Sequence, residues 1–259
     1  MKELFQQLKE KVRPKQLFGQ NFLIQPAIYE KIVEASKIEK GEFVVEIGGG
    51  TGILTKYLTE AGADVVSIEK DRDLIPLLKE NVPSAKIIEG DIMKIDIDSL
   101  ELKPNEYKIV ANIPYYLTSK LLRNIFEKWP KPKLIILMVQ YELAKRMTAK
   151  PPEMNLLALS TQYYSKSQVL TKVSKGNFWP MPDVDSALIK LELKKLDFDQ
   201  DFSNTLFQIA KKAFSGKRKK LSNTLRDYKE TLADSGIDSD RRPETLSVEE
   251  WVSLTLNIR

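Results

Sequence analysis

From about residue 40 onward, short apolar runs alternate with segments of helical spacing. The apolar runs are rich in β-branched residues and apolar on both faces, as in a buried parallel sheet. They occupy residues 43–47, 64–69, 85–91, 107–112 and 133–139. Segments of helical spacing, bounded by Gly, Thr, Ser or Pro signals, occupy residues 53–61, 72–82 and 119–129. This alternation predicts an α/β fold with a doubly wound, mostly parallel sheet and right-handed crossovers.

The two ends of the chain follow different patterns. The first forty residues predict an N-terminal helix, a basic glycine-containing loop over residues 11–20, and a helix beginning near Pro26. Residues 167–174 and 186–193 alternate more regularly and predict two strands that pair at an edge of the sheet. Residues 194–202 look like a linker, and the chain beyond them shows only helical patterns. We therefore expect a larger domain over residues 1–194 and a small all-helical domain over residues 195–259.

Composition narrows the possible chemistry. The chain has 259 residues, enough for one large and one small domain, and it contains neither cysteine nor histidine. This excludes disulfides, thiolate or imidazole metal ligands and histidine general bases, so we expect no metal and a chemistry of carboxylates, amides, hydroxyls, lysines or geometry. No apolar run is long enough to span a membrane, and the first residues lack the apolar core of a signal peptide. We expect a cytoplasmic monomer.

A glycine-rich turn follows the first predicted strand, with glycines at positions 48, 49, 50 and 52. Glycines there let the backbone approach a ligand at the carboxyl ends of the strands, where open α/β sheets bind ligands. The dinucleotide pattern G-x-G-x-x-G would need a third glycine at position 53, which is Ile53. The spacing Gly48, Gly50, Gly52 resembles instead the E/D-x-G-x-G-x-G turn of class I S-adenosylmethionine-dependent methyltransferases, which implies a Rossmann-like fold. Taken alone, the turn could also be a plain strand-to-helix connection.

Polar acceptors stand at the ends of the next three predicted strands. Glu69 is placed where a carboxylate can accept from ribose hydroxyls, a feature shared with NAD-binding proteins. Asp91 can accept from an adenine amino group, although it could equally cap the turn that follows. Asn112 ends the fourth strand. Because these ends meet at one edge of the sheet, we expect a single ligand crevice.

The stretch N-I-P-Y-Y over residues 112–116 suits methyl transfer to an amine. The lone pair of an exocyclic adenine nitrogen is delocalised into the ring, so the nitrogen must be oriented before it can attack a sulfonium methyl. The side-chain oxygen of Asn112 and the backbone carbonyl of Ile113 or Pro114 can accept its two hydrogens. Pro114 fixes the loop, and Tyr115 offers a ring for stacking an unstacked base. The alternative is an Asn-Pro turn beside core tyrosines.

Five ordered motifs resemble one family. The N-I-P-Y motif with Ile in second place is typical of ribosomal RNA adenine dimethyltransferases, and FGQNFL over residues 18–23 is similar to their N-terminal motif. NFWPMPDVDSALIKL over residues 177–191 is similar to their F-x-P-x-P-x-V-x-S segment, and RRPETLSVEEW lies near the C-terminus. Together with the glycine turn, these motifs resemble the KsgA family of small-subunit (16S) rRNA adenine N6,N6-dimethyltransferases over almost the whole chain.

The resemblance implies a role for several residues. It implies S-adenosylmethionine contacts from Asn21, Leu23, Gly48, Gly50, Glu69, Asp91 and Asn112. It also implies that Tyr115 and Phe178 sandwich the target adenine, and that the larger domain is catalytic while the helical domain binds RNA. Two positions depart from many relatives: Tyr116 stands where Asn is common, and Gly49 where Pro is common. Neither departure removes a needed group, but Tyr116 leaves open which ring stacks.

Two basic segments predict contacts with RNA phosphates. One contains Lys11, Arg13 and Lys15, and residues 211–226 carry seven basic side chains and no acidic one. Within that second run we expect Lys217, Arg218, Lys219 and Lys220 to contact RNA. Such contacts give affinity and orientation rather than sequence choice, although either run alone could be an ordinary solvated face.

The leading interpretation is an enzyme that dimethylates N6 of two adjacent adenosines in a small-subunit rRNA hairpin loop during ribosome biogenesis. Its partner would be the small ribosomal subunit, as 16S rRNA in a pre-30S particle. One alternative is a large-subunit rRNA dimethyltransferase of the antibiotic-resistance type, against which the RPETLS segment argues. Another is a mainly non-catalytic ribosome-assembly factor that uses the same basic surface. An NAD-binding protein is a remote third alternative.

Overall fold

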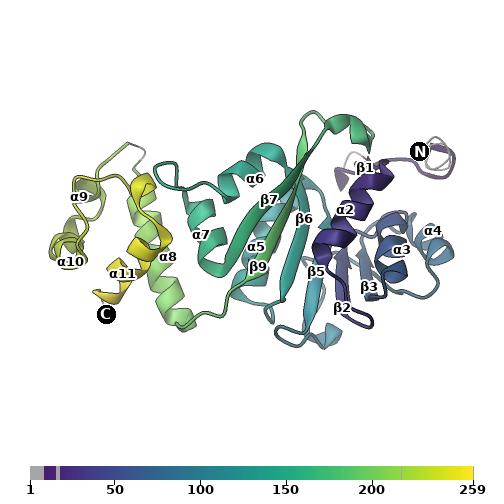
Figure 1. Ribbon diagram of the computed structural model, residues 1–259, viewed down its shortest axis with the longest axis horizontal. Helices are drawn as coiled ribbons and strands as arrows, with labels where there is room; N and C mark the ends of the chain where they lie inside the picture. The colour runs from purple at the N-terminus through teal and green to yellow at the C-terminus, as the bar shows by residue number, and fades with distance from the viewer. Residues whose placement is uncertain (1–8, 16–17, 217, 259) are drawn as a thin grey trace. The chain divides into compact units, whose positions relative to one another are not determined.

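A seven-stranded sheet forms the centre of the protein, in the strand order β4-β3-β2-β5-β6-β9-β7 (Figure 1). The computed structural model describes residues 9–15, 18–216 and 218–258, and of Tyr115 it describes only the backbone. The strands of this sheet are β2 (Phe43–Ile47), β3 (Asp64–Glu69), β4 (Lys86–Glu89), β5 (Tyr107–Asn112), β6 (Leu134–Gln140), β7 (Ser165–Val173) and β9 (Ser186–Leu193). Strands β4, β3, β2, β5 and β6 are parallel, and β9 is antiparallel to β6.

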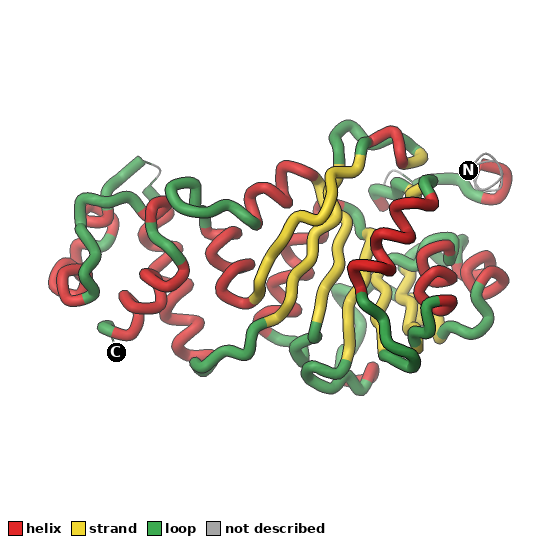
Figure 2. Tube along the Cα trace, viewed as in Figure 1, coloured by secondary structure: helices red, strands yellow, loops and turns green. Residues whose placement is uncertain are grey.

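Helices alternate with the parallel strands, as predicted (Figure 2). They are α2 (Pro26–Ser36), α3 (Ile53–Glu60), α4 (Ile75–Asn81) and α5 (Thr118–Glu127). Apolar residues of α2 and α3, among them Ile32 and Leu58, share one buried cluster with Val44, Val110 and Ile136 of the sheet. Single turns of 3-10 helix lie at η2 (Asp98–Leu100), η3 (Tyr115–Leu117), η4 (Lys175–Asn177), η5 (Arg226–Tyr228) and η6 (Pro243–Thr245).

Most predicted strands are confirmed. Strands β2, β3, β5 and β9 span the predicted residues, and β7 and β9 are neighbours at the edge of the sheet. Strand β4 ends at Glu89, two residues before the predicted end, and the side chains of this edge strand are only partly covered. Its amphipathic exposure follows from its place at the edge, where one side of the ladder has no partner.

A second, two-stranded sheet was not predicted. It pairs β1 (Phe22–Leu23) antiparallel with β8 (Phe178–Trp179), so that Leu23 faces Phe178 in the ladder. Strands of two residues are too short to leave a periodic pattern in the sequence. The pairing brings the FGQNFL motif and the F-x-P-x-P segment, far apart in the chain, side by side.

The chain divides into two compact units, residues 1–142 with 168–193, and residues 143–167 with 194–259. The helices of the second unit are α7 (Leu156–Tyr164), α8 (Gln200–Phe214), α9 (Leu221–Thr224), α10 (Lys229–Asp234) and α11 (Val248–Leu256), and α6 (Tyr141–Met147) crosses from the first unit. This division differs from the expected domains in that residues 143–167 belong with the C-terminal helices. Tyr164 stacks on Phe207 of α8, and the Tyr163 hydroxyl is 2.9 Å from Ser203 Oγ.

Two further details bear on the predictions. Helix α8 begins at Gln200, inside the expected linker, because the Asp199 side chain accepts the Phe202 N–H at 2.8 Å and caps the helix. Within the described parts of residues 195–258 the regular elements are all helical, as predicted. In the described part of the chain, no helix has the length and apolarity needed to cross a membrane.

Candidate active site

A pocket lies at the carboxyl ends of β2, β3, β4 and β5, where the sequence predicted a crevice. It encloses about 1080 Å³ of empty space, part of it open to solvent, which is large enough for a nucleoside-sized cofactor. Its lining comes from the glycine turn after β2, the ends of the three neighbouring strands, and residues 18–23. Five segments that are distant in the sequence therefore meet at one edge of the sheet.

The glycine turn brings bare backbone to the pocket. Gly48 and Gly50 have φ of +83° and +57°, in the left-handed region that favours glycine. A Cβ atom at Gly48 would lie 3.3 Å from the Asn112 carbonyl oxygen. Side chains at these positions would therefore both strain the turn and crowd the end of β5.

Glu69, the last residue of β3, points its carboxylate at the turn. Its Oε2 accepts the Gly50 N–H and its Oε1 the Asp71 N–H, both at 2.7 Å. Burial raises the pKa of this carboxyl, and the two backbone hydrogen bonds partly offset the effect. Each oxygen keeps a further lone pair, so the carboxylate can still accept from hydroxyl groups in the pocket.

Asp91 lies two residues beyond the end of β4 and lines the same pocket. One oxygen accepts the Met93 N–H at 3.0 Å, and the other pairs with Lys70 Nζ at 3.0 Å. Burial raises the pKa of Asp91, but these two partners outweigh it and hold the pKa below its usual range. Both interpretations from the sequence therefore apply, because Asp91 caps a turn and also presents a carboxylate to the pocket.

The N-I-P-Y-Y stretch forms the pocket wall at the end of β5. Asn112 and Pro114 line the pocket, and the Pro114 carbonyl accepts the Leu117 N–H at 3.0 Å to close the η3 turn. Tyr116 also lines the pocket, with 62% of its surface exposed. The expected stacking ring, Tyr115, has its side chain outside the described part of the structure, so its role stays a prediction.

The N-terminal motif supplies the opposite wall. Asn21 and Leu23 both line the pocket, as the resemblance implied. The Asn21 side chain donates to the Gly19 carbonyl at 3.1 Å, and the Leu23 carbonyl accepts the buried Tyr29 hydroxyl at 2.7 Å. A Cβ at Gly19 would lie 3.3 Å from Pro114 Cβ, so this motif packs directly against the N-I-P-Y loop.

Phe178 differs from its expected role. Its ring is 3% exposed and belongs to the hydrophobic cluster under the sheet, because β8 pairs with β1 and turns this side chain inward. Phe178 is not among the described residues that line the pocket. In this conformation it offers no face to a base, and its stacking on the target adenine stays a prediction that requires movement.

A buried polar cluster under the glycine turn was missed from the sequence. Glu46 of β2 is fully buried, and its Oε2 accepts from Thr55 Oγ1 at 2.5 Å and Ser67 Oγ at 2.6 Å. Burial raises the pKa of Glu46 to about 7, despite these two hydrogen bonds. A Cβ at Gly49 would lie 2.2 Å from Ser67 Oγ, so the cluster fixes what the turn can accommodate. Glu46 reads in the sequence only as one polar residue in an apolar strand.

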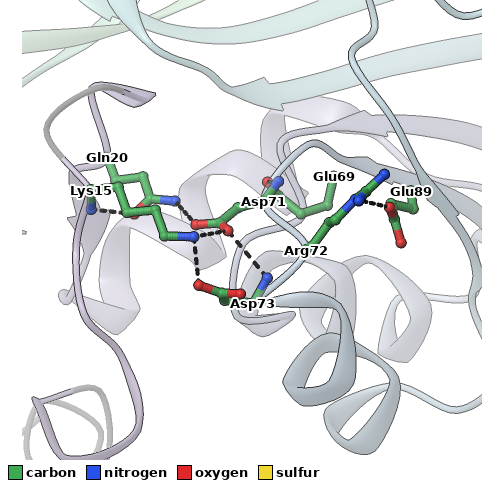
Figure 3. Close-up of polar contacts among 7 residues, drawn as sticks. All are labelled: Lys15, Gln20, Glu69, Asp71, Arg72, Asp73 and Glu89. Carbon is green, nitrogen blue, oxygen red and sulfur yellow. Dashed lines mark hydrogen bonds and ion pairs between the residues drawn. The ribbon is translucent and has the colours of Figure 1, made fainter.

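A polar network beside the pocket was missed as well (Figure 3). Asp71 accepts from Gln20 Nε2 at 2.7 Å and pairs with Lys15 Nζ at 2.5 Å. Lys15 also pairs with Asp73, at 2.6 Å. Gln20 was noted only as a letter of the N-terminal motif, and the D-x-D pattern of Asp71 and Asp73 was the available signal.

The basic residues predicted to contact RNA fall in both compact units. Lys11 and Arg13 are exposed, whereas Lys15 is engaged by the two aspartates described above. In the second unit Arg218, Lys219 and Lys220 are exposed, and Lys220 pairs with Asp240 at 3.0 Å. Lys217 lies outside the described residues.

Comparison with known proteins assigns the chain to a family. The family model described as "Ribosomal RNA adenine dimethylase" matches residues 11–259. The chain is 36% identical over 257 residues to the Ribosomal RNA small subunit methyltransferase A of Dehalococcoides mccartyi, covering 95% of this chain and 88% of the relative.

Two solved structures share the fold. A dimethyladenosine transferase from Plasmodium falciparum has a TM-score of 0.75 and 25% identity, covering 90% of this chain and 95% of that one. The 23S rRNA methyltransferase ErmE has a TM-score of 0.75 at 22% identity, covering 92% of this chain and 99% of that one. The predicted class I methyltransferase fold is thus confirmed, and the protein belongs to the ribosomal RNA adenine dimethylase family.

Proposed function

We propose that this protein transfers methyl groups from S-adenosylmethionine to N6 of two adjacent adenosines in a hairpin loop of small-subunit (16S) rRNA. The substrate would be the small ribosomal subunit during its biogenesis, as a pre-30S particle in the cytoplasm. One observation carries the proposal: the glycine turn, Glu69, Asp91 and Asn112 converge on one pocket beside the N-I-P-Y loop. The expected monomeric state remains a prediction.

The residues present fit S-adenosylmethionine. The turn at Gly48 and Gly50 leaves a space that Cβ atoms would fill, next to the Asn112 carbonyl and the Phe22 ring. Glu69 offers carboxylate oxygens suited to ribose hydroxyls, and Asp91 one suited to an adenine amino group. When bound, S-adenosylmethionine would supply a methyl group activated by a positive sulfonium sulfur.

The N-I-P-Y loop would orient the amine that receives the methyl group. Asn112 Oδ1 would accept one N–H of the adenine amino group, and a backbone carbonyl the other. The Pro114 carbonyl already accepts the Leu117 N–H, so we assign the second acceptor to Ile113. With both hydrogens held, the nitrogen lone pair turns out of the ring plane toward the methyl donor.

This arrangement needs no general base inside the pocket. The attacking nitrogen is neutral and becomes cationic as the new N–C bond forms, after which its proton can leave to solvent. The oxygens of Asn112 and Ile113 stabilise that developing positive charge because they accept its N–H groups. Catalysis by position and electrostatics agrees with a chain that has no histidine or cysteine.

The family relationship supports the small-subunit RNA over the large-subunit alternative. The relative named as a small-subunit enzyme is 36% identical over nearly the whole chain, whereas the likeness to ErmE is one of fold alone. Exposed Arg218 and Lys219 of the second unit are suited to RNA phosphates. Recognition of a structured RNA through phosphates and an unstacked base is the common mode for such substrates.

The test is methylation of unmodified small subunits by wild type and by the Asn112→Ala variant. Mass spectrometry of the rRNA should show two dimethylated adenosines with wild type, and primer extension should place them next to each other in one loop. Asn112→Ala should lose about 10²-fold or more of the rate, as expected for one lost oriented acceptor. A variant as active as wild type would refute the mechanism, and modification of large-subunit RNA would refute the substrate.

A further inference from the structure

Asp71 occupies an unusual position beside the pocket. It follows Glu69 by two residues, its carboxylate is 2% exposed, and it does not line the pocket in the described part of the chain. Its Oδ2 accepts from Gln20 Nε2 at 2.7 Å, and its Oδ1 from Lys15 Nζ at 2.5 Å and from the Asp73 N–H at 3.2 Å (Figure 3). Both oxygens of this buried carboxylate are therefore used.

The backbone of the same residue acts on the cofactor side. The Asp71 N–H donates to Glu69 Oε1 at 2.7 Å, while the Gly50 N–H holds the other oxygen. These two bonds fix the plane of the carboxylate that we assign to the ribose. Asp71 thus contacts one pocket residue, Glu69, through its main chain and another, Gln20, through its side chain.

Gln20 transmits the second contact to the opposite wall of the pocket. Its Nε2 donates to Asp71, and its Oε1 accepts the Lys15 N–H at 2.8 Å. It is followed directly by Asn21 and preceded by Gly19, which packs against Pro114. The Gln20 side chain therefore fixes the segment that carries Asn21 and abuts the N-I-P-Y loop.

We propose that Asp71 is a positioning residue of the cofactor site, which orients Glu69 through its N–H and anchors residues 18–23 through its carboxylate. Lys15 then serves as the counter-charge of a buried carboxylate rather than as a phosphate contact. The inference rests on the proposed function, because it concerns binding of S-adenosylmethionine by this pocket.

The hydrogen-bond pattern makes the carboxylate necessary. Gln20 cannot reverse its amide, because Oε1 must face the Lys15 N–H and Nε2 must then face Asp71. An Asn at position 71 would offer one acceptor and one donor. Its NH₂ group would face either the Gln20 NH₂ or the Lys15 ammonium and the Asp73 N–H, so every orientation puts donor against donor.

The same logic designs a rescue. In the double variant Asp71→Asn with Gln20→Glu, the new carboxylate accepts both the Lys15 N–H and the Asn amide hydrogen. The Asn oxygen then keeps the contacts from Lys15 Nζ and the Asp73 N–H. Gln20→Glu alone places two carboxylates face to face and should be at least as damaging as Asp71→Asn alone. Asp73→Asn is the matched control, since its exposed side chain contacts the same ammonium and does not line the pocket.

The experiment measures S-adenosylmethionine binding by calorimetry and amide hydrogen exchange of residues 18–23 in the cofactor-free protein. Asp71→Asn should weaken binding about tenfold or more and speed exchange, as expected for a lost charge-assisted hydrogen bond in a buried site. In turnover assays KM for the cofactor should rise by the same factor, with kcat changed less than about threefold. The double variant should recover most of the affinity and protection, and Asp73→Asn should stay within about twofold of wild type.

Three outcomes would overturn the proposal. Wild-type affinity and exchange in Asp71→Asn would show that the network does not position the site. Loss without recovery in the double variant would show a general folding defect instead of the assigned hydrogen bonds. A wild-type protein that does not bind S-adenosylmethionine would refute the proposed function and this inference together, and normal binding by wild type separates the two failures.

Discussion

Glu46 provides the sharpest test of the electrostatics, because its carboxyl is fully buried beneath the glycine turn. Burial raises its pKa from the ordinary 4.5 to about 7, against the Ser67 and Thr55 hydrogen bonds, and the nearby Glu69 charge raises it further. The folded protein therefore binds a proton that the unfolded chain releases between pH 4.5 and 7. The contribution of Glu46 to stability is complete below pH 4.5 and falls as pH rises through this window.

The magnitude follows from the two pKa values. A tenfold change in an acid constant corresponds to about 1.4 kcal/mol, so ionising Glu46 in the folded state costs about 3 kcal/mol in all. Between pH 5 and pH 8 the loss should be about 2 kcal/mol. Glu46→Gln mimics the protonated acid: its amide oxygen can keep both hydrogen bonds, and its NH₂ takes the place of Oε1, which has no hydrogen-bond partner among the described residues.

The assay is urea unfolding of wild type and Glu46→Gln at pH 5, 6, 7 and 8. The free energy of unfolding of the variant, relative to wild type, should increase by about 2 kcal/mol across the series. Glu42→Gln is the control, because the Lys108 ion pair, opposing burial, holds the pKa of Glu42 below its ordinary value. Glu42 is ionised in both states over this range, so its difference from wild type should be flat. Parallel curves for Glu46→Gln would refute the buried-acid reasoning.

Two further predictions follow from the turn and from the basic surface. Gly49→Ala should cost about 1–3 kcal/mol in unfolding free energy, because its Cβ would lie 2.2 Å from Ser67 Oγ, and the cost should shrink in a Ser67→Ala background. An undiminished cost would show that the backbone of the turn, rather than this contact, is the obstacle. Arg218→Ala and Lys219→Ala should each weaken rRNA binding and lower the slope of log affinity against log salt by about 0.7–0.9, measured by fluorescence anisotropy. Lys220→Ala should lower it less, since Lys220 already pairs with Asp240, and equal slopes for all three would contradict the assignment.

The parts of the fold that the sequence predicted are those buried on both faces. Strands β2, β3 and β5 sit in the middle of the parallel sheet, so nearly every position in them is apolar and their bounds are sharp. The edge strand β4 ended early, and residues 143–167 were placed in the wrong unit because helical spacing does not say which neighbour a helix packs against. The two-residue strands β1 and β8 left no pattern at all.

The candidate site was predictable where one residue type is required by chemistry. Glycine at 48 and 50 and an acceptor at the end of β3 could be identified because nothing else suits those places. Phe178 was expected at the substrate because its motif suggested it, yet the pairing of β8 with β1 turns its ring into the core. Long-range pairing of this kind is not encoded in local sequence.

The motifs are joined by residues outside them, and this changes how the site should be understood. Glu69 takes its orientation from the Asp71 and Gly50 N–H groups, and Gly49 takes its space from Ser67. Each is a contact between a residue that touches the pocket, or shapes its turn, and one that sequence comparison would pass over. Substitutions one layer behind the pocket should therefore change cofactor affinity while leaving every motif intact. The relative effect on KM and kcat distinguishes these positioning residues from Asn112, whose loss should fall on kcat.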